Sequence, residues 1–467
     1  MHLHNGPLSP FSLSSPIMAL PPAPANPIPA AADTDQISLL PDCILTTILS
    51  LLPLPAAART QILSRRWRRL WPSAPLHLLD SHLPVPTPSL PAAVSQILAT
   101  HRGNAARFDV LLARPSAADL DSWLRSLAAK HLQELVLRPP DVPLRLPPSL
   151  LSCRSLRSAE LTNCRLPEDA SAATAGEVYF PHLAELTLRL SRAPSAATLR
   201  GLLAGCPELA SLSLDRVFGC RTLCVRSRGL RSLTVSVSLT RQRVLEGAEE
   251  LEHLVVEDAP ALERLLAHDI NWGPSINIVH APRLQMLGYL GVGIPELQLG
   301  SALFRSMHAV RLAAEFRCVR TLALEMADPQ VKHVADFLQC FPCLETLYVT
   351  SHMVVPQSME ILNYEMDDPI ECLNYCLKTV VLKGYRGRKH EVQLAMFLVR
   401  CARVLRVMKF LCENDCNPSW LTNQKRRLLL DKRASLGAQF VFQKFTKSYI
   451  RFLKKASNIS LVDPFDT

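Results

Sequence analysis

Hydrophobic residues follow a helical spacing near the N-terminus and a different, repeating spacing through the rest of the chain. Apolar side chains recur every three or four positions from Ile44 to Leu52, which predicts one face of a short helix. Pro41 suits the first turn of this helix, where the N–H that proline lacks would be unpaired in any case. Pro53 ends the helix, because a proline forces the preceding residue out of the helical region.

Two more short helices are expected directly after this one. Pro55 can open a second helix over residues 56–63, and Ser64 is a suitable N-cap for a third helix. The third helix carries a run of arginines and stops at Pro72. A segment of about 30 residues rarely fills a core of its own. We therefore expect its apolar face to contact either another chain or the rest of this one.

The second spacing begins near residue 92 and is a repeat of the form L-x-x-L-x-L. Its units start about 21 to 35 residues apart, close to the period of leucine-rich repeats. Alternate side chains of a short strand point to the same face, so each unit can bury its leucines only against its neighbours. The repeat predicts a solenoid with a parallel sheet on its concave side. The units begin at Leu132, Leu156, Leu183, Leu209, Leu230, Leu251, Leu284, Val319, Leu344, Leu377 and Leu405.

Helical patterns lie between some of these strands and are expected on the convex side of the solenoid. They cover residues 196–204, 329–339 and 389–401. The array is irregular, because residues 271–280 and 292–312 fit no unit well. Extra loops in these two stretches are candidates for binding, since loops on a rigid scaffold often carry function.

Composition limits the classes of function that the chain can have. The 467 residues suffice for more than one domain, and an apolar content of 48% permits a large core. The net charge of +10 is modest for this length and does not by itself imply a polyanionic partner. No apolar run reaches the length of a membrane span, so we expect no membrane partner.

The 14 cysteines are scattered without a tight framework, which points to the reducing environment of cytosol or nucleus. Cys206, Cys340 and Cys401 follow helical patterns where the chain turns into a strand, and we interpret them as small buried residues. Cys340 and Cys343 have the spacing of a redox or metal pair, but no second pair stands at a suitable distance. We predict no metal and no cofactor.

Familiar catalytic motifs are missing from the sequence. It contains no phosphate loop, dinucleotide fingerprint, zinc-protease helix or nucleophile elbow, so we expect no enzyme. The basic stretch at residues 425–455 could bind nucleic acid or act as an import signal. We interpret it instead as a solvated capping helix, and nucleic acid is not an expected partner.

The N-terminal helical segment resembles the plant F-box. The resemblance runs from Asp35 to Trp71 and rests on DQISLLPD, ILSLLP and LSRRWRRLW in this order and spacing. Periodicity alone would fit an internal helical hairpin equally well, and the ordered motif favours the F-box. In that family the segment inserts into a Skp-type adaptor, which links it to cullin and RING subunits of a ubiquitin ligase. The resemblance assigns adaptor contacts, or packing just behind them, to Leu40, Pro41, Ile44, Ile48, Leu49, Leu52, Pro53, Leu63, Trp67 and Trp71.

The C-terminal part resembles the FBD domain that often follows the repeats of plant F-box proteins. The residues that carry this resemblance are LKTVVLKGYRG and the helical pattern HEVQLAMFLVR that follows. By this resemblance, residues 425–434 form a last helix and residues 438–445 a last strand that caps the stack. Residues 447–467 are expected to be a frayed tail.

The expected fold is therefore an α/β protein in which a three-helix F-box precedes an irregular leucine-rich-repeat solenoid. The segments are a disordered Pro/Ala-rich tail (1–34), the F-box (35–76), a Pro-rich linker (77–91), the irregular repeats (92–369), FBD-like repeats with a cap (370–446) and a tail (447–467).

The resemblance to the plant F-box implies a substrate-recognition subunit of a Skp–cullin–F-box ubiquitin ligase, which we expect in nucleus and/or cytoplasm. The repeats would bind the target protein through exposed positions beside the inward leucines. The candidate target contacts, chosen by repeat geometry alone, are Glu134, Glu185, Ser213 and Glu345. The alternative is a repeat scaffold that acts without the ligase, for example as a nuclear binding protein.

Overall fold

The fold was analysed in a computed structural model, which describes most of the chain from residue 36 onward. The described residues are 36–37, 39–83, 90–110, 115–139, 142–168, 179–236, 249–267, 273–291, 293–314, 316–326, 328–351, 369–413, 416–444 and 462–466. The predicted N-terminal tail, residues 1–34, lies outside them. Among the described helices, none is both long enough and apolar enough to cross a bilayer.

Three short helices open the described part of the chain, as the sequence predicts. They are α1 (Asp42–Leu51), α2 (Leu54–Arg59) and α3 (Arg65–Leu70). The Ser64 side chain caps α3 by accepting a hydrogen bond from the Trp67 N–H at 3.4 Å. Pro72 does not end the helical backbone at once, because it lies within a 3₁₀ turn that follows α3. We call residues 39–74 the helical module.

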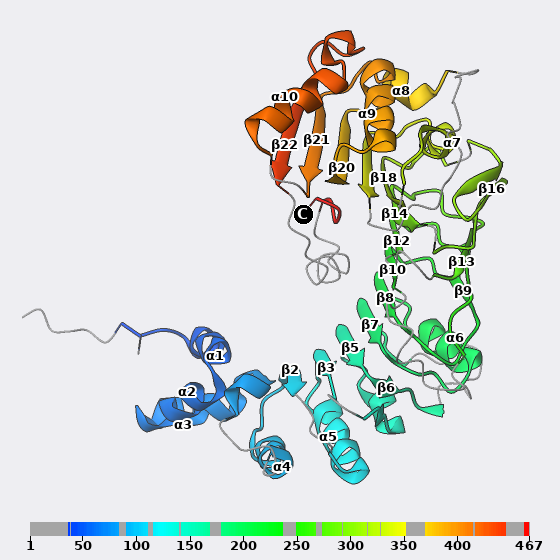
Figure 1. Ribbon diagram of the computed structural model, residues 1–467. Helices are drawn as coiled ribbons and strands as arrows, with labels where there is room; N and C mark the ends of the chain where they lie inside the picture. Colours follow the sequence, from blue (N-terminus) through cyan, green and yellow to red (C-terminus); the bar gives the residue numbers. More distant parts are fainter. Residues whose placement is uncertain are drawn as a thin grey trace, which may run out of the picture.

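A 14-stranded sheet follows, and its strands stand in chain order with every neighbouring pair parallel. Figure 1 shows it as the inner wall of an arc that rises from the helical module to the C-terminal helices. The predicted solenoid is therefore confirmed. The strands are β1 (Leu76–Leu79), β2 (Ala105–Val110), β3 (Glu134–Leu137), β5 (Ser158–Thr162), β7 (Glu185–Arg189), β8 (Ser211–Asp215), β10 (Ser232–Ser236), β12 (Arg264–Ala267), β14 (Met286–Gly291), β18 (Thr321–Met326), β19 (Thr346–Ser351), β20 (Thr379–Tyr385), β21 (Val407–Cys412) and β22 (Gln439–Lys444).

Helices cover the convex side at both ends of the arc (Figure 1). Two of the three predicted helices, over residues 196–204 and 389–401, have the expected bounds, and the third starts two residues later than predicted. The helices are α4 (Leu90–Thr100), α5 (Ala117–Ala129), α6 (Ala196–Ala204), α7 (Val331–Cys340), α8 (Glu371–Tyr375), α9 (Lys389–Cys401) and α10 (Pro418–Arg427).

In the middle of the arc the convex wall is a second sheet, which corrects the expectation of helices there. Its six strands are β9 (Thr222–Arg226), β11 (His253–Asp258), β13 (Ser275–Ile278), β15 (Glu296–Leu299), β16 (Ala302–Arg305) and β17 (His308–Arg311). Buried residues alternate along β9, β11, β13 and β15, and this period of two specifies a strand with one covered face. The repeat unit at Leu251 belongs to this outer wall as β11, and the two stretches that fit no unit supply β13 and β15 to β17.

Three other expectations need correction. The Pro-rich linker at residues 77–91 contains most of β1 and the start of α4, because Leu76 and Leu78 alternate as buried residues and pair with β2. The last helix starts at Pro418 instead of residue 425, because the Asn417 side chain caps it by accepting from the Trp420 N–H at 2.8 Å. The C-terminal tail is not frayed throughout, because Phe465 is fully buried.

The space between the two walls is filled by one continuous core of leucines, valines and phenylalanines. Phe304 of β16 stacks on Phe337 of α7, with ring centroids 4.2 Å apart, where the outer sheet gives way to helices. A minor two-stranded sheet, β4 (Leu144–Arg145) with β6 (Cys164–Arg165), lies beyond the ends of β3 and β5.

Strand β13 provides a test of the outer wall, because two adjacent residues differ in burial there. Ile278 is fully buried, whereas Val279 is 57% exposed. Ile278→Ala should lower the free energy of unfolding by about 2–5 kcal/mol, because it removes buried methyl groups and leaves a cavity. The matched control, Val279→Ala, should change it by less than about 0.5 kcal/mol. Urea denaturation measures both, and equal midpoints would contradict the placement of β13 in the core.

Candidate functional site

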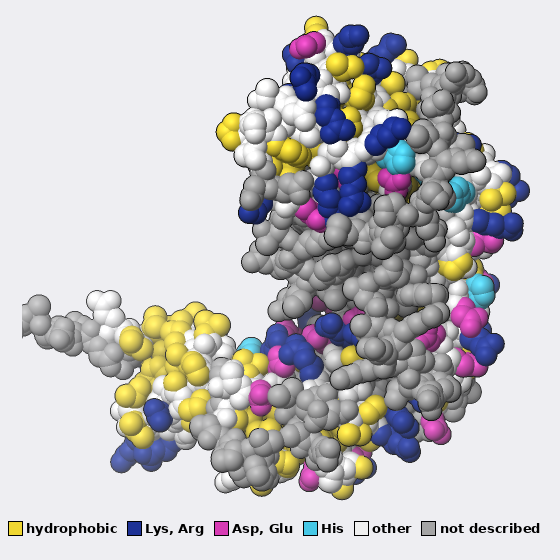
Figure 2. All heavy atoms as spheres, in the orientation of Figure 1, with side chains coloured by type: hydrophobic (Ala, Val, Ile, Leu, Met, Phe, Trp, Pro, Cys, Tyr) yellow, Lys and Arg dark blue, Asp and Glu magenta, His cyan; other side chains and the backbone are white. Residues whose placement is uncertain are grey.

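Helix α1 of the helical module is apolar on both its inner and its outer side. Leu45 and Leu49 are buried in the module, whereas Ile44, Ile48 and Leu51 are 46%, 36% and 80% exposed. Figure 2 shows hydrophobic side chains gathered over α1 and α2. Exposed apolar side chains that gather in one patch are typical of an interaction surface. We call the exposed large apolar residues of the whole module the outer apolar face. They are Leu39, Ile44, Ile48, Leu51, Ile62 and Leu63.

A small core supports this face from behind. It is formed by Leu45, Leu49, Ala57, Trp67, Leu70 and Ala74. Among the ten residues predicted to serve the adaptor, Pro41, Ile44, Ile48, Pro53 and Leu63 are exposed, Leu40, Leu52 and Trp71 are half-buried, and Leu49 and Trp67 are buried. The first group therefore lies on the surface of the module, and the last two pack in its small core.

Arg66 joins the first helix of the module to the third. Its guanidinium lies 2.6 Å from the Asp42 carboxylate and also donates to the Leu40 carbonyl at 2.5 Å. Both acceptors stand at the N-terminus of α1, so one side chain fixes how the two helices cross. The exposed side of α3 carries the other arginines of the run.

The module is attached to the first rung of the repeats. The backbone N–H groups of Arg102 and Gly103 donate to the Pro72 carbonyl at 3.0 and 2.7 Å. The Trp71 ring meets the His101 ring edge-on, with centroids 5.3 Å apart. Gly103 is required here, because a Cβ would lie 2.4 Å from the Ala74 carbonyl oxygen. These contacts set the orientation of the module relative to the repeats.

The first half of the concave face, from β2 to β8, carries a network of ion pairs. The interior leucines of each strand point into the core, so the alternate residues face the hollow of the arc. Arg107 pairs with Asp109 at 2.8 Å and with Glu134 at 3.0 Å, and Arg138 pairs with Glu160 at 3.1 Å and Asp109 at 3.3 Å. Figure 2 shows charges of both signs mixed on the inner side of the arc.

The four residues predicted to contact a target occupy two kinds of position. Glu134, Glu185 and Ser213 lie on concave-facing positions of β3, β7 and β8, although Ser213 is buried and Glu134 is engaged by Arg107. Glu345 instead precedes β19, at the amino-terminal edge of the sheet, where it binds Lys378 at 2.6 Å. Three of the four residues that were chosen by repeat geometry therefore lie on the concave face.

The second half of the concave face, from β12 to β21, was missed by sequence reasoning. It presents Tyr289 and Tyr348 together with Lys383, which is almost fully buried. The repeat pattern assigns Tyr289 to the core, and this is wrong. The pairing of β14 with β18 shifts between Leu287 and Leu290, so Leu290 takes the inward place. The sequence does hold one signal that could have located this surface. It is a tyrosine or a lysine at a strand position that alternates with the inward residues, as in LETLYV and VVLKGY.

The shift in β14 occurs at Gly288. Its φ of 142° lies in the region that L-residues other than glycine rarely adopt, and a Cβ would come within 2.4 Å of the Ala323 carbonyl oxygen. Glycine thus allows β14 to approach β18 while Tyr289 turns toward the hollow of the arc.

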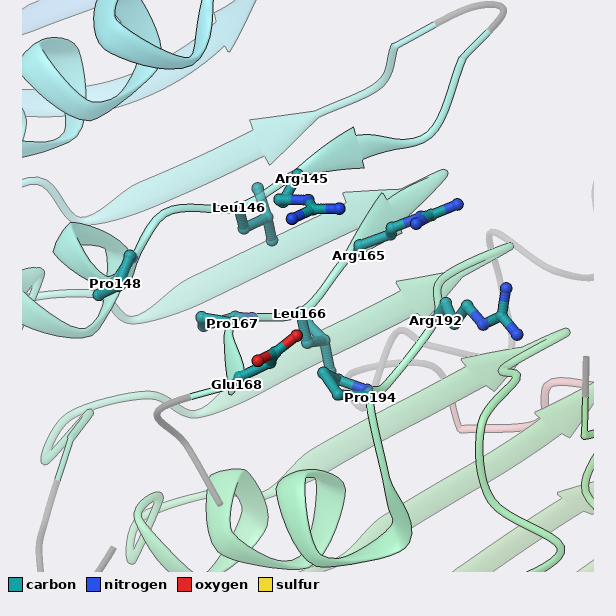
Figure 3. Close-up of a pocket in the computed structure, with 9 residues that line it drawn as sticks. All are labelled: Arg145, Leu146, Pro148, Arg165, Leu166, Pro167, Glu168, Arg192 and Pro194. Atoms are coloured by element: carbon teal, nitrogen blue, oxygen red, sulfur yellow. The ribbon is translucent and has the colours of Figure 1, made fainter. Parts of the chain in front are cut away.

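A separate groove of about 370 Å³ lies beside the minor sheet (Figure 3). Arg145 of β4, Arg165 of β6 and Arg192 on the following rung line it, together with Glu168 and several prolines. The groove therefore has a mainly basic polar lining near the carboxyl ends of the first strands.

The cysteines at the helix-to-strand turns differ in burial. Cys206 and Cys340 are buried, and burial raises the pKa of their thiols to about 12 and about 11. Cys401 is only half-buried, and the pKa of its thiol is raised by the same cause. Thiols with raised pKa values are poor nucleophiles and poor ligands at neutral pH.

Comparison with known proteins gives three family matches. A model described as "FBD-associated F-box protein At5g56370, LRR repeats" matches residues 120–349, an F-box domain model matches residues 37–79, and an FBD model matches residues 365–410. Similar curated proteins come from Arabidopsis thaliana. F-box/FBD/LRR-repeat protein At3g52680 is 25% identical, over 89% of this chain and 94% of its own length. F-box/FBD/LRR-repeat protein At4g00160 is 26% identical over 89% and 95%, and FBD-associated F-box protein At5g56370 is 27% identical over 80% and 90%.

The junction between module and repeats should make stability depend on pH. Burial, with a contribution from Lys130, lowers the pKa of His101, so this histidine is neutral when folded. Its stabilising effect is complete above the unfolded-state pKa of about 6.5 and is lost as pH falls toward the lower folded-state pKa.

We expect His101→Gln to reduce the loss of stability between pH 7 and pH 5. Thermal unfolding of both proteins across this range measures the difference. A residual slope will remain in the variant, because burial also lowers the pKa of His333 to about 4. Identical pH profiles for wild type and variant would contradict a buried neutral histidine at the junction.

Proposed function

Because the chain belongs to the plant proteins that combine an F-box, leucine-rich repeats and an FBD region, we propose that it is the substrate-recognition subunit of a Skp–cullin–F-box ubiquitin ligase. The F-box would dock on a Skp-type adaptor, and the repeats would bind the target protein. The F-box family match at residues 37–79 confirms the family resemblance carried by the motif from Asp35 to Trp71, and the ligase role is inferred from it.

The observation that carries this proposal is the outer apolar face of the module. Ile44, Ile48 and Leu51 point outward from a helix whose inner residues are already packed. Burying an apolar side chain of this size is worth roughly 1.5–3 kcal/mol, so three of them would contribute substantially to docking. The fixed junction at Pro72 would then place the concave sheet in a set direction from the adaptor.

In this role the chain performs no chemistry of its own. It would hold a target near the ubiquitin-loaded enzyme and so raise the effective concentration of target lysines there. Cullin and RING subunits would join through the adaptor, and the complex would work in nucleus and/or cytoplasm. The target would contact the concave face, whose first half offers paired charges and whose second half offers tyrosines and a lysine.

Exposed positions of α1 give the sharpest test of docking. The double variant Ile44→Asp/Ile48→Asp would place two carboxylates in the contact without disturbing the core, because neither residue is buried. We expect it to weaken adaptor binding at least about 30-fold, the effect of losing roughly 2 kcal/mol at an interface. Binding to purified Skp-type adaptors is measured by titration calorimetry, with circular dichroism to verify the fold.

The matched control is Val310→Asp, which changes a similarly exposed apolar residue on β17, in the convex wall. It should bind the adaptor as wild type does. Leu49 is unsuitable for this test, because it is only 1% exposed and its replacement would unfold the module. If wild type binds no Skp-type adaptor, the ligase role fails and the ligase-independent scaffold becomes the better account of the repeats.

A further inference from the structure

Five residues at the C-terminus, 462–466, lie against the second half of the concave face. Figure 1 shows this end of the chain on the inner side of the arc. Phe465 is fully buried and belongs to a cluster separate from the core between the walls. The other members of this cluster come one each from β12, β14, β18, β19, β20 and β21, and they are Leu266, Tyr289, Ala323, Tyr348, Val381 and Leu411.

Two tyrosines hold the phenylalanine ring. The centroid of Phe465 lies 5.1 Å from that of Tyr289 at an interplanar angle of 76°, and 5.5 Å from that of Tyr348 at 48°. The first of these is the edge-to-face geometry that aromatic pairs prefer. The rings thus form a socket on the sheet surface instead of filling the space between the walls.

Lys383 forms the polar centre of the same socket. Its ammonium donates to the Phe465 carbonyl oxygen at 2.5 Å and to the Tyr289 hydroxyl at 3.2 Å. It also lies over the Tyr348 ring, 5.3 Å from the centroid. A buried ammonium is costly unless acceptors surround it, and here the C-terminal segment supplies one of them.

Both aspartates of the segment meet groups that favour an anion. The Tyr348 hydroxyl donates to Asp463 at 2.8 Å, and Lys409 lies 3.8 Å from Asp466. The Phe465 N–H donates to the Asp463 carboxylate at 2.9 Å and so closes a tight turn. Burial, together with Asp463, raises the pKa of Tyr348, so its hydroxyl stays protonated as a donor.

We propose that this socket is a binding site for a short peptide of the target protein, in which a phenylalanine stands between two acidic residues. Residues 463–466 of the chain, Asp-Pro-Phe-Asp, occupy the site as a tethered competitor. Naming the target as the source of the peptide rests on the proposed function. The recognition chemistry rests on the contacts of Tyr289, Tyr348, Lys383 and Lys409 alone.

Two features distinguish a ligand site from an ordinary structural contact. The sheet already ends in its own last strand, β22, so the segment adds no strand to the fold. Its contacts also include one buried aromatic ring and several charged or polar groups, which a peptide of the same chemistry can reproduce. On the first half of the face, by contrast, Arg107 and Arg138 are paired with acids on the same or neighbouring strands of the sheet.

The direct test uses a fluorescent peptide with the sequence of residues 461–467, LVDPFDT. Its binding is compared between the full chain, a chain that ends at residue 461, and full-length Phe465→Ala. We expect both changed proteins to bind the peptide at least ten-fold more tightly than the full chain, because a tethered segment competes at high effective concentration. Val462→Ala is the matched control, since Val462 is 85% exposed and should leave the competition unchanged.

The chemistry of recognition is tested in the Phe465→Ala background. Adding Lys383→Met should abolish peptide binding, and adding Tyr348→Phe should weaken it for LVDPFDT but not for LVNPFDT, which lacks the first carboxylate. A peptide with an alanine in place of its phenylalanine should not bind. A peptide that keeps only the DPFD core between Gly and Ser residues should bind as LVDPFDT does.

Two results would overturn the proposal. The first is that the truncated chain and Phe465→Ala keep native circular dichroism but bind neither LVDPFDT nor the DPFD core in foreign flanks. The same conclusion holds if the truncated chain unfolds and Phe465→Ala binds neither of these peptides. In both cases the segment is only a part of the fold. The second is that these two proteins bind LVDPFDT but not the DPFD core in foreign flanks. The socket would then be specific for the chain's own C-terminal segment and would not be a site for a target peptide. Adaptor binding, measured on the same samples, reports the ligase role separately, so a failure of one idea leaves the other standing.

Discussion

A parallel strand that turns two of its residues into the core must turn the residues between them to the opposite side, and the whole arc depends on this constraint. Apolar side chains of the fourteen strands, mostly leucines, fill the space between two walls. The positions between them therefore face the hollow of the arc, whatever residues stand there. Along β2 to β5 they include arginines and acids that pair across strands, and along β12 to β21 they include tyrosines, lysines and aliphatic residues. Folding thus fixes where a partner can be met, and the choice of residues at these positions is left free for recognition.

The helical module divides its apolar residues in a similar way, on a helical period. Adjacent positions on α1 differ by about 100°, so Leu45 and Leu49 reach the small core while Ile44 and Ile48 remain outside. The inner set makes the module a stable unit, and the outer set gives it a surface that water does not favour. A module with this division has a packed inner side and an apolar outer side, which under the proposed function suits a subunit that assembles on an adaptor.

The sequence predicted most of the inner wall, because a repeated leucine spacing has one physical meaning when it recurs along the chain. It could not assign the wall to which a given strand belongs, since ELEHLVV in β11 has the same pattern as the concave units. It also misplaced Tyr289, because RLQMLGYL does not reveal that a glycine shifts the register by one residue. The apolar outer face of α1 could be predicted from the motif, whereas the socket for Phe465 depends on contacts between residues about fifty to two hundred positions apart.

The join at Pro72 has a consequence for selectivity. Hydrogen bonds from Arg102 and Gly103, with the Trp71–His101 contact, make the module and the first rung one rigid piece. Under the proposed function, the arc would then hold its target at a fixed distance and angle from the adaptor. A captured protein would be modified only on lysines that happen to fall within the arc's reach, and the local sequence around those lysines would matter little. Two proteins carrying the same recognition peptide could thus meet different fates, according to how far from that peptide their lysines lie.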